Sequence, residues 1–267
     1  MKTHGYATEV SVVIPVRDEE PNILLLHEEL TCVMRGAGIQ YEVLIIDDGS
    51  TDGTFPVLAG LQRRDSHLRV IRFTRNFGQT AAFAAGFAYA RGRFVATLDG
   101  DLQNDPADIP RLLALAAHYD IVCGWRKERH DDWLTRKVPS VIANWLIGLV
   151  SGTPLHDNGC SLKIFRADIV KRLNLRPGMH RYLPALAVQL GNGVREEPVN
   201  HRPRRFGRSK YGLSRTFQVV ADLVRLPSLK RAASDPTMPR HHLYEVAEIL
   251  EDVAEPQTIG HAHRGSL

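Results

Sequence analysis

Asp99, Asp101 and Gln103 stand at alternate positions directly after a short apolar run and could bind a divalent cation. Alternate residues of an extended stretch point to the same side, so their two carboxylates and one amide could converge. Oxygen ligands of this kind suit Mg²⁺ or Mn²⁺, which proteins hold with one or two carboxylates plus the phosphates of a substrate. Taken alone, the motif also fits a simple N-cap cluster ahead of the helix expected from Pro106.

Three further groups of polar residues, at 17–19, 47–48 and 75–76, each follow an apolar run. Each group could serve only as a turn or a helix cap. However, the carboxyl ends of parallel strands meet at one edge of a sheet, which is where ligands bind in such sheets. We therefore expect these groups to lie beside Asp99 and Asp101. No glycine-rich P-loop or dinucleotide motif follows the first strand, which disfavours those nucleotide-binding classes.

The elements that must position these residues alternate along the chain. Apolar runs predict strands over 10–16, 41–46, 68–73, 93–98 and 120–123, and helical patterns fill the intervals between them. The second half adds a strand that ends at 165, a helix over 182–190, an extended stretch over 194–200 and a short helix over 243–253. Such alternation predicts an α/β fold, with a Rossmann-like, mostly parallel central sheet and helices on both of its faces.

Composition excludes several classes of protein. The chain has 267 residues, of which 43% are apolar and 24% charged, as in an ordinary globular domain. Its three cysteines argue against a disulfide framework and fit a reducing compartment. The sequence shows no signal-peptide pattern. It also lacks the run of about 18 apolar residues that a transmembrane helix needs.

Charge is distributed unevenly near the C-terminus. Residues 200–231 include nine basic residues and one acidic residue, whereas residues 232–267 include two basic and six acidic residues. The basic stretch favours an anionic partner, namely a phosphate, a lipid headgroup or a nucleic acid. We predict a globular domain over 1–212, an amphipathic interfacial helix over 213–231 and a loose acidic tail over 232–267.

Several longer motifs carry a resemblance to a known family. VSVVIPVRDEEPNI, VLIIDDGSTDGT, RNFGQTAAFAAGF and TLDGDLQNDPADIP, in this order and spacing, resemble glycosyltransferase family 2 enzymes, which have a GT-A fold. HDNGCSLKIFR and RRFGRSKYG resemble the dolichol-phosphate mannose synthase branch, which includes bacterial polyprenyl-phosphate glycosyltransferases. The resemblance covers Val10 to Leu226.

The resemblance implies roles for individual residues. The nucleotide-sugar site would include Pro15, Val16, Glu19, Asp48 and Asp99, with Asp48 near the base. The Mg²⁺ or Mn²⁺ ligands would be Asp99, Asp101 and Gln103. Catalysis would involve Asp101 and Asp157, and the acceptor phosphate would meet Arg204, Ser209 and Lys210. Arg17 stands where relatives often carry Tyr. Because a phosphate acceptor is already anionic near neutral pH, we expect Asp157 to orient groups rather than to remove a proton.

The implied function is inverting transfer of a sugar from a UDP- or GDP-linked donor to polyprenyl phosphate. An acidic segment stands where many bacterial relatives continue into two membrane-spanning helices. Attachment to the cytoplasmic face of the membrane would then rest on the amphipathic helix, the basic loop or an anchoring partner protein, and no nucleic-acid partner is implied. A soluble glycan or protein acceptor and a non-catalytic nucleotide-sugar-binding role remain alternatives. The sugar and the oligomeric state are not indicated.

Overall fold

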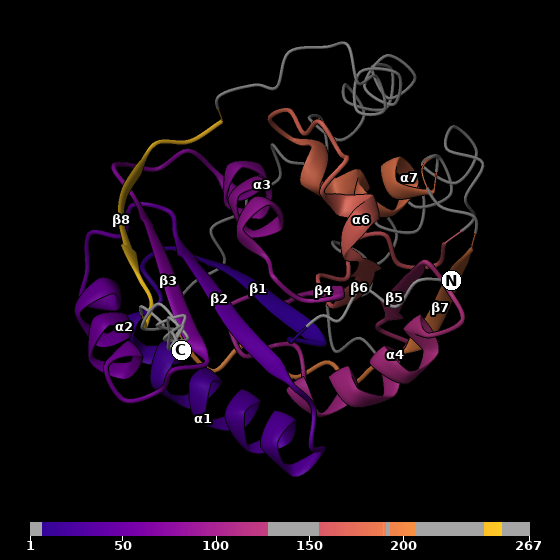
Figure 1. Ribbon diagram of the computed structural model, residues 1–267, viewed down its shortest axis with the longest axis horizontal. Coiled ribbons are helices and arrows are strands. Elements are labelled where there is room, and N and C mark those ends of the chain that lie inside the picture. The colour runs from indigo at the N-terminus through magenta and orange to yellow at the C-terminus, as the bar shows by residue number, and fades with distance from the viewer. Residues whose placement is uncertain (1–6, 128–154, 189, 191–192, 207–242, 253–267) are drawn as a thin grey trace, which may run out of the picture.

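A single eight-stranded sheet organises the molecule. The computed structural model describes residues 7–127, 155–188, 190, 193–206 and 243–252. In these residues the strand order is β7-β5-β6-β4-β1-β2-β3-β8 (Figure 1). The strands are β1 (Val10–Val16), β2 (Tyr41–Asp47), β3 (Leu68–Phe73), β4 (Phe94–Thr97), β5 (Ile121–Trp125), β6 (Lys163–Arg166), β7 (Val194–Pro198) and β8 (Val246–Leu250).

Parallel pairing dominates the sheet. β1 pairs in parallel with β2 and β4, β2 with β3, and β5 with β7, whereas β6 and β8 run antiparallel to their neighbours. The predicted mostly parallel sheet is therefore confirmed. The carboxyl ends of six strands, β1 to β5 and β7, face the same edge.

Helices cover both faces of the sheet, which forms the middle of three layers (Figure 1). One face packs against α1 (Glu20–Gly36), α2 (Thr54–Gln62) and α4 (Ile109–Ala116). The other packs against α3 (Gln79–Tyr89), α6 (Ala167–Val170) and α7 (Leu183–Ala187). Two 3₁₀ turns, η1 (Pro106–Asp108) and η3 (Met179–Tyr182), precede α4 and α7.

The central strands are apolar throughout because both of their faces are buried. In β1, Val13 packs in the cluster that contains α3, whereas Val12 and Ile14 pack in the cluster that contains α1. This double burial explains the near-continuous β-branched runs in the sequence. It also holds the strand ends, and the turns that follow them, in a fixed arrangement.

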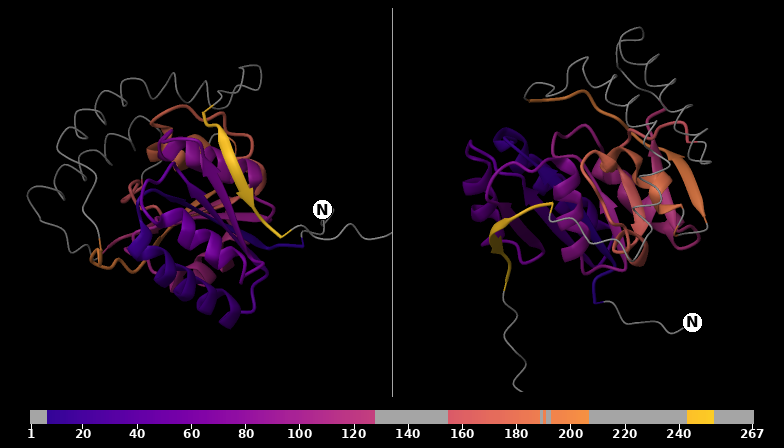
Figure 2. Two further views of the ribbon diagram at one scale, coloured as in Figure 1. Left: turned by 90° about the vertical axis from the view of Figure 1, so that its left-hand side faces the viewer. Right: turned by 90° about the horizontal axis from the view of Figure 1, so that it is seen from above.

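The C-terminal part of the described chain corrects one prediction. The short helix expected over 243–253 is wrong, because residues 246–250 form β8, which runs antiparallel to β3 at the sheet edge (Figure 2). Tyr244 stacks on Phe73 with ring centroids 5.1 Å apart, and Glu251 accepts a hydrogen bond from Arg69 at 2.7 Å. Pairing with an otherwise open strand edge satisfies backbone groups that a surface helix would leave exposed on β3.

The predicted boundary at 212 and the predicted interfacial helix over 213–231 lie outside the described residues. Both stay predictions. No helix in the described part of the chain is long and apolar enough to cross a membrane.

Candidate functional site

Hydrogen bonds join the turn after β1 to the turn after β2. The backbone N–H of Asp18 donates to Ser50 Oγ at 2.9 Å, and that of Thr51 donates to Asp18 Oδ1 at 2.8 Å. The N–H of Glu19 donates to Thr54 Oγ1 at 2.9 Å. Asp18 has a φ of 49°, an unusual conformation for a residue with a side chain, and these bonds hold it there. The first two polar groups therefore meet, as their positions after the strands predicted.

Asp48 joins the turn after β2 to the turn after β3. Its Oδ1 accepts the N–H of Phe77 at 2.7 Å, and its Oδ2 accepts the N–H of Gly78 at 2.9 Å and Asn76 Nδ2 at 3.1 Å. Burial raises the pKa of Asp48 above its ordinary value, and the N–H groups of Phe77 and Gly78 oppose that rise only in part. The carboxylate is thus engaged in fastening two turns together. Its place near a nucleobase stays a prediction.

Glycine is required where these two turns touch. Gly49 has a φ of 67°, and a Cβ atom there would collide with the backbone of Arg75. Close approach of the two turns lets α3 begin beside the loop that follows β4. There, Gln79 Nε2 donates to Asp99 Oδ1 at 3.0 Å. The polar groups that follow β1, β2, β3 and β4 are therefore linked in one continuous series.

Asp101 is 8% exposed and sits in a turn rather than an extended stretch. The intervening Leu102 has a φ of 62°, and Asp101 Oδ1 accepts the backbone N–H of Gln103 at 3.2 Å. The expected alternation along an extended chain is therefore wrong. Burial of Leu102 holds this conformation. Packing and local hydrogen bonding, not strand-like alternation, orient Asp101.

The environment of Asp101 is electrostatically unfavourable for a charged carboxylate. Burial, then the nearby charge of Asp99, raise its pKa to about 6, with a further contribution from Glu19. Arg204 and the N–H of Gln103 oppose the rise. Three acidic side chains therefore share one region, where like charges disfavour ionisation. A cation bound here would relieve that repulsion.

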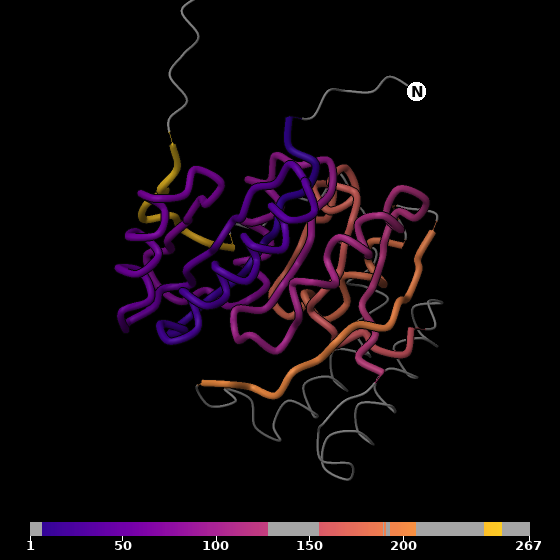
Figure 3. Tube along the Cα trace, turned by 90° about the horizontal axis from the view of Figure 1, so that it is seen from below, coloured from indigo at the N-terminus to yellow at the C-terminus, as the bar shows by residue number. Residues whose placement is uncertain are grey.

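The segment after β7 crosses the loop that carries these acids (Figure 3). Arg202 N–H donates to the carbonyl of Gln103 at 2.8 Å, and the Arg202 guanidinium pairs with Glu29 at 2.6 Å and Asp105 at 2.7 Å. Gln103 Nε2 lies 3.4 Å from the carbonyl of Arg202. Arg202 thus fastens the crossing, while Arg204, two residues later, donates to Asp101 Oδ2.

Asp157 forms a second centre next to the end of β5. The Arg126 side chain donates to both of its carboxylate oxygens, from Nε at 2.7 Å and from Nη2 at 2.9 Å. Burial alone would lower the pKa of Arg126, but hydrogen bonding and the charge of Asp157 raise it. The N–H of Asp157 and the ring of His156 both bond to Glu196, at 2.8 Å each. Asp157 is thus a buried, ion-paired carboxylate.

The remaining predicted residues are placed as follows. Val16 is buried, and its carbonyl accepts the N–H of Asp48 at 2.9 Å, while Pro15 is partly exposed in β1. Ser209 and Lys210 lie outside the described residues. The roles given to all these residues stay predictions. What the structure brings together is the acidic pair with Glu19, Gln79 and Arg204.

The family model for glycosyl transferase family 2 matches residues 11–173. The protein belongs to glycosyltransferase family 2.

A curated relative supports the same family. A dodecaprenyl-phosphate galacturonate synthase from Rhizobium johnstonii is 44% identical over 233 residues, which cover 85% of this chain and 69% of the relative. The expected likeness to the polyprenyl-phosphate branch is confirmed by this relative.

Solved structures support the fold. Glucosyl-3-phosphoglycerate synthase from Mycobacterium tuberculosis, in complex with Mn²⁺, UDP and glucosyl-3-phosphoglycerate, has a TM-score of 0.65 and 16% identity, and the match covers 92% of this chain and 89% of that one. Mannosyl-3-phosphoglycerate synthase from Rubrobacter xylanophilus has a TM-score of 0.64 and 16% identity, covering 92% and 88%. The predicted GT-A fold of this glycosyltransferase is confirmed.

Three residues of the candidate site escaped prediction from the sequence: Gln79, Arg126 and Glu196. Arg126 directly follows β5, so the rule that ligands bind at the carboxyl ends of strands would have found it. Gln79 is the first residue of α3 and follows a polar turn. Glu196 lies inside β7, and no local signal distinguishes it from a surface glutamate.

The acidic pair fits a divalent cation that is completed by a substrate. In the described ranges, no three His, Cys, Asp or Glu side chains are grouped as a complete metal centre. Asp99 and Asp101 instead supply two carboxylates whose mutual repulsion a cation would remove. Mg²⁺ and Mn²⁺ are commonly held in this way, with substrate phosphates supplying further oxygens.

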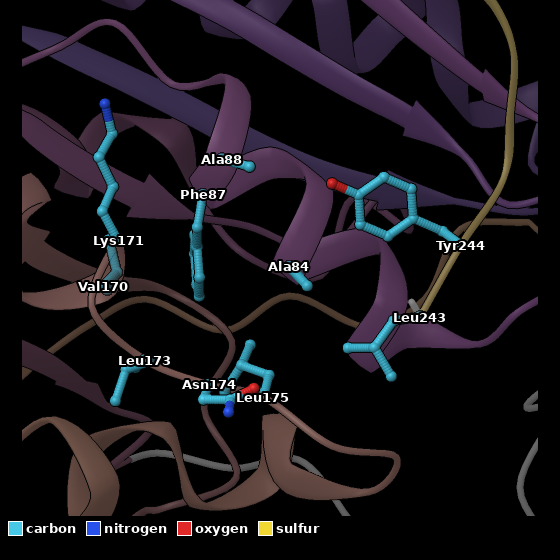
Figure 4. A pocket seen from close by; sticks show the side chains of 10 residues that line it. All are labelled: Ala84, Phe87, Ala88, Val170, Lys171, Leu173, Asn174, Leu175, Leu243 and Tyr244. Atoms are coloured by element: carbon cyan, nitrogen blue, oxygen red, sulfur yellow. The ribbon is translucent and has the colours of Figure 1, made fainter. Parts of the chain in front are cut away.

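A small pocket lies away from this edge, between α3, the region after α6 and the chain that enters β8 (Figure 4). Phe87, Leu173, Leu175 and Leu243 contribute apolar side chains to it. It contains none of the residues predicted to bind donor, cation or acceptor. The pocket is therefore separate from the candidate site.

Proposed function

We propose that this glycosyltransferase moves a sugar, with inversion at the anomeric carbon, from a nucleoside-diphosphate donor to polyprenyl phosphate. The observation that carries the proposal is the meeting of Asp99, Asp101 and Arg204 at the carboxyl ends of the strands. The residues offer a carboxylate pair for a cation and a guanidinium for phosphate. The dodecaprenyl-phosphate galacturonate synthase, a 44% identical relative, supports a lipid phosphate as the acceptor.

The donor would lie along the turns that follow β1, β2 and β4, where Pro15, Val16, Glu19 and Asp48 are expected to line its site. Mg²⁺ or Mn²⁺ held by Asp99, Asp101 and Gln103 would neutralise the charge that develops on the departing diphosphate. Solved structures of the glucosyl-3-phosphoglycerate synthase with Mn²⁺ and UDP-glucose support a metal-assisted donor site. In this chain, Gln79 holds Asp99 and the tight turn at Leu102 holds Asp101.

The reaction forms one bond and breaks one. A phosphate oxygen of the acceptor attacks the anomeric carbon, and the bond from that carbon to the donor diphosphate breaks, so that the nucleoside diphosphate leaves with the electron pair. An anionic acceptor has no proton that must be removed. The bidentate pairing of Asp157 with Arg126 therefore supports a positioning role for Asp157, because both carboxylate oxygens are already in use.

The acceptor side would use basic residues. Arg204, Ser209 and Lys210 are expected to meet the acceptor phosphate, and an arginine can hold a phosphate bidentately. Arg204 is close enough to Asp101 to bond to it, which supports an acceptor phosphate next to the cation. Peripheral attachment to the inner face of the membrane would bring the chain to a lipid acceptor, either directly or through an anchoring partner protein.

Transfer assays with a panel of donors test this proposal. The purified chain is incubated with UDP- and GDP-linked sugars, a nucleoside-diphosphate galacturonate first among them, with and without Mn²⁺ and with polyprenyl phosphate in detergent. We expect a polyprenyl-phosphate sugar product, detected by mass spectrometry, that requires the cation. Inversion is checked by the anomeric coupling constant of the product. No lipid product from any donor would contradict the proposal.

A soluble acceptor is the second candidate. The solved structure of the glucosyl-3-phosphoglycerate synthase in complex with phosphoglyceric acid supports a small phosphorylated acceptor as this alternative. The same donors are therefore incubated with phosphoglycerate and with soluble glycans. Product from these acceptors alone would favour the second candidate, and donor binding without transfer to any acceptor would favour a non-catalytic role.

A further inference from the structure

Arg204 occupies the carboxylate that the proposed cation needs. Its Nη2 donates to Asp101 Oδ2, and the other oxygen of Asp101 accepts the backbone N–H of Gln103 at 3.2 Å. Asp101 is 8% exposed and Arg204 is partly buried, so the pair is largely shielded from water. Both oxygens of this aspartate therefore have partners within the protein before a cation arrives.

The chain just before Arg204 is firmly attached. The Asn200 N–H donates to Asp108 at 2.8 Å, the Arg202 N–H donates to Gln103 at 2.8 Å, and the Arg202 guanidinium pairs with Glu29 and Asp105. These contacts hold the backbone across the loop that carries Asp101. Arg204 can therefore leave Asp101 by a change of side-chain rotamer, without any movement of the segment.

A divalent cation and the guanidinium compete for Asp101. Mg²⁺ binds oxygens at about 2.0–2.1 Å, so a cation on Asp101 would lie next to the guanidinium that bonds to the same carboxylate. A guanidinium next to a doubly charged cation is also repelled, more strongly where water is excluded. A nucleoside diphosphate changes this balance, because its oxygens offer the released guanidinium a bidentate partner.

We propose that Arg204 and the divalent cation exchange on Asp101, and that a nucleoside diphosphate drives the exchange by receiving the released guanidinium. This inference rests on the proposed cation site. Before the donor binds, Arg204 neutralises the carboxylate. Once the donor and its cation bind, Arg204 turns first to the donor diphosphate, and it meets the acceptor phosphate when that second substrate binds. The residue therefore couples cation binding to phosphate binding as a positioning residue for both.

The exchange has a thermodynamic consequence. Because Arg204 must be displaced, the cation alone binds weakly, and the diphosphate increases its affinity. Coupling between two ligands is reciprocal, so the cation increases the affinity for the diphosphate by the same factor. Removal of the guanidinium removes both the group that competes with the cation for Asp101 and the group that binds the diphosphate. The affinity for the cation alone then rises, while its enhancement by the diphosphate shrinks.

Titration with MnCl₂, followed by electron paramagnetic resonance of free Mn²⁺, tests the proposal on the full chain. Arg204→Ala is compared with the wild type and with Arg205→Ala, which removes the same charge from an exposed neighbour. We expect Arg204→Ala to bind Mn²⁺ alone roughly tenfold more tightly, and Arg205→Ala to match the wild type. UDP or GDP should increase the Mn²⁺ affinity of the wild type. The factor of this increase should be at least several-fold smaller in Arg204→Ala.

Two further variants keep the outcomes distinct. Arg204→Lys retains the charge without the planar fork and should give an intermediate Mn²⁺ affinity. Asp101→Asn should lose Mn²⁺ binding whichever residue stands at 204. If the wild type binds Mn²⁺ but Arg204→Ala binds it no more tightly, the exchange is wrong and the proposed cation site survives. If the wild type binds no Mn²⁺ with either nucleotide, both proposals fail.

Discussion

Two clusters of charged residues, each with buried members, lie at opposite ends of the same strands, and their charges are balanced differently. The amino-end cluster consists of Ser11, Glu42, Arg69, Arg91 and Glu251. The carboxyl-end cluster consists of Glu19, Asp99, Asp101 and Arg204.

In the amino-end cluster each charge has its counterpart. Arg69 donates to Glu42 and to Glu251 at 2.7 Å each, and Arg91 donates to Glu251 at 2.8 Å. The second oxygen of Glu42 accepts the hydroxyl of Ser11 and the N–H of Arg91. Glu42 and Arg69 are each only 5% exposed. Two arginines and two glutamates thus form a closed, neutral set that attaches β8 to the sheet.

The carboxyl-end cluster is not balanced in this way. Arg204 bonds to Asp101, yet burial and the charge of Asp99 still raise the pKa of Asp101 to about 6. The proposed cation, arriving with the substrate, would relieve this unfavourable environment of Asp101.

The largest expected effect comes from removing the charge of Asp101. Asp101→Asn should reduce kcat/KM for sugar transfer roughly a thousandfold, about 4 kcal/mol, because a cation at the leaving diphosphate supplies several kcal/mol of transition-state stabilisation. Initial rates at an Mn²⁺ concentration that saturates the wild type measure the loss. Asp168→Asn, an exposed acid of α6, serves as the control and should keep the full rate. A loss below fivefold in Asp101→Asn would separate Asp101 from the chemistry.

Removing an ion pair from the amino-end cluster should reduce the stability of the protein and leave its catalytic rate unchanged. Arg69→Met leaves Glu42 buried without its cation, and we expect the free energy of unfolding to fall by about 3 kcal/mol. Urea denaturation measures it, and the rate per folded molecule should not change. The double variant Glu42→Gln/Arg69→Met should recover part of the loss. If it recovers nothing, the pairing of Arg69 with Glu42 is not the source of the effect.

The sequence predicted the first half of the fold because its signals are local. Strands β1 to β4 are apolar runs that end at polar or glycine residues. Each is followed closely along the chain by a helix. The prediction of a helix over 243–253 was wrong because Leu243, Val246 and Leu250 have helical spacing although the segment forms β8. Its actual partner, β3, lies more than 170 residues away, and pairing at that distance leaves no trace in a local pattern.

The candidate site was predictable in part for the same reason. The rule that ligands bind at the carboxyl ends of strands located Asp99 and Asp101 from nearby sequence. It did not show that Gln79 bonds to Asp99, that Arg126 pairs with Asp157, or that Arg204 turns to Asp101. These partners come from loops that are distant in the sequence and that the strand order brings to one edge of the sheet, and no local pattern specifies that order.

Stability should respond to pH differently at Asp101 and at a paired acid. The pKa of Asp101 is 3.8 in the unfolded chain and about 6 in the folded protein. The folded protein therefore loses stability as the pH rises between these values. Without metal at pH 7.5, Asp101→Asn should therefore be more stable than the wild type by about 3 kcal/mol, and close to the wild type at pH 4. Urea denaturation in EDTA tests this at both pH values.

Asp105 supplies the control of opposite sign. Burial tends to raise its pKa, but hydrogen bonds from Asn200, Ala107 and Arg202 lower it overall. A carboxyl with a lowered pKa stabilises the folded protein at pH values above its ordinary pKa. This contribution is lost as the pH falls. Asp105→Asn should therefore destabilise the protein at pH 7.5. Equal effects of the two substitutions would mean that the surroundings of Asp101 do not disfavour its charge more than those of Asp105 do.

The smallest expected effect concerns how the acidic pair is held. Gln79 Nε2 donates to Asp99 Oδ1 at 3.0 Å, so Gln79→Ala should leave that carboxylate less well oriented. Loss of a hydrogen bond to a metal ligand typically weakens metal affinity about tenfold or more. We expect the Mn²⁺ affinity in the presence of UDP or GDP to fall about tenfold, with little change in the midpoint of urea denaturation. Gln40→Ala, before β2, is the control and should leave both values unchanged. An unchanged Mn²⁺ affinity in Gln79→Ala would mean that packing alone orients Asp99. The carboxyl-end cluster would then owe its geometry to packing, and the raised pKa of Asp101 would still distinguish it from the amino-end cluster.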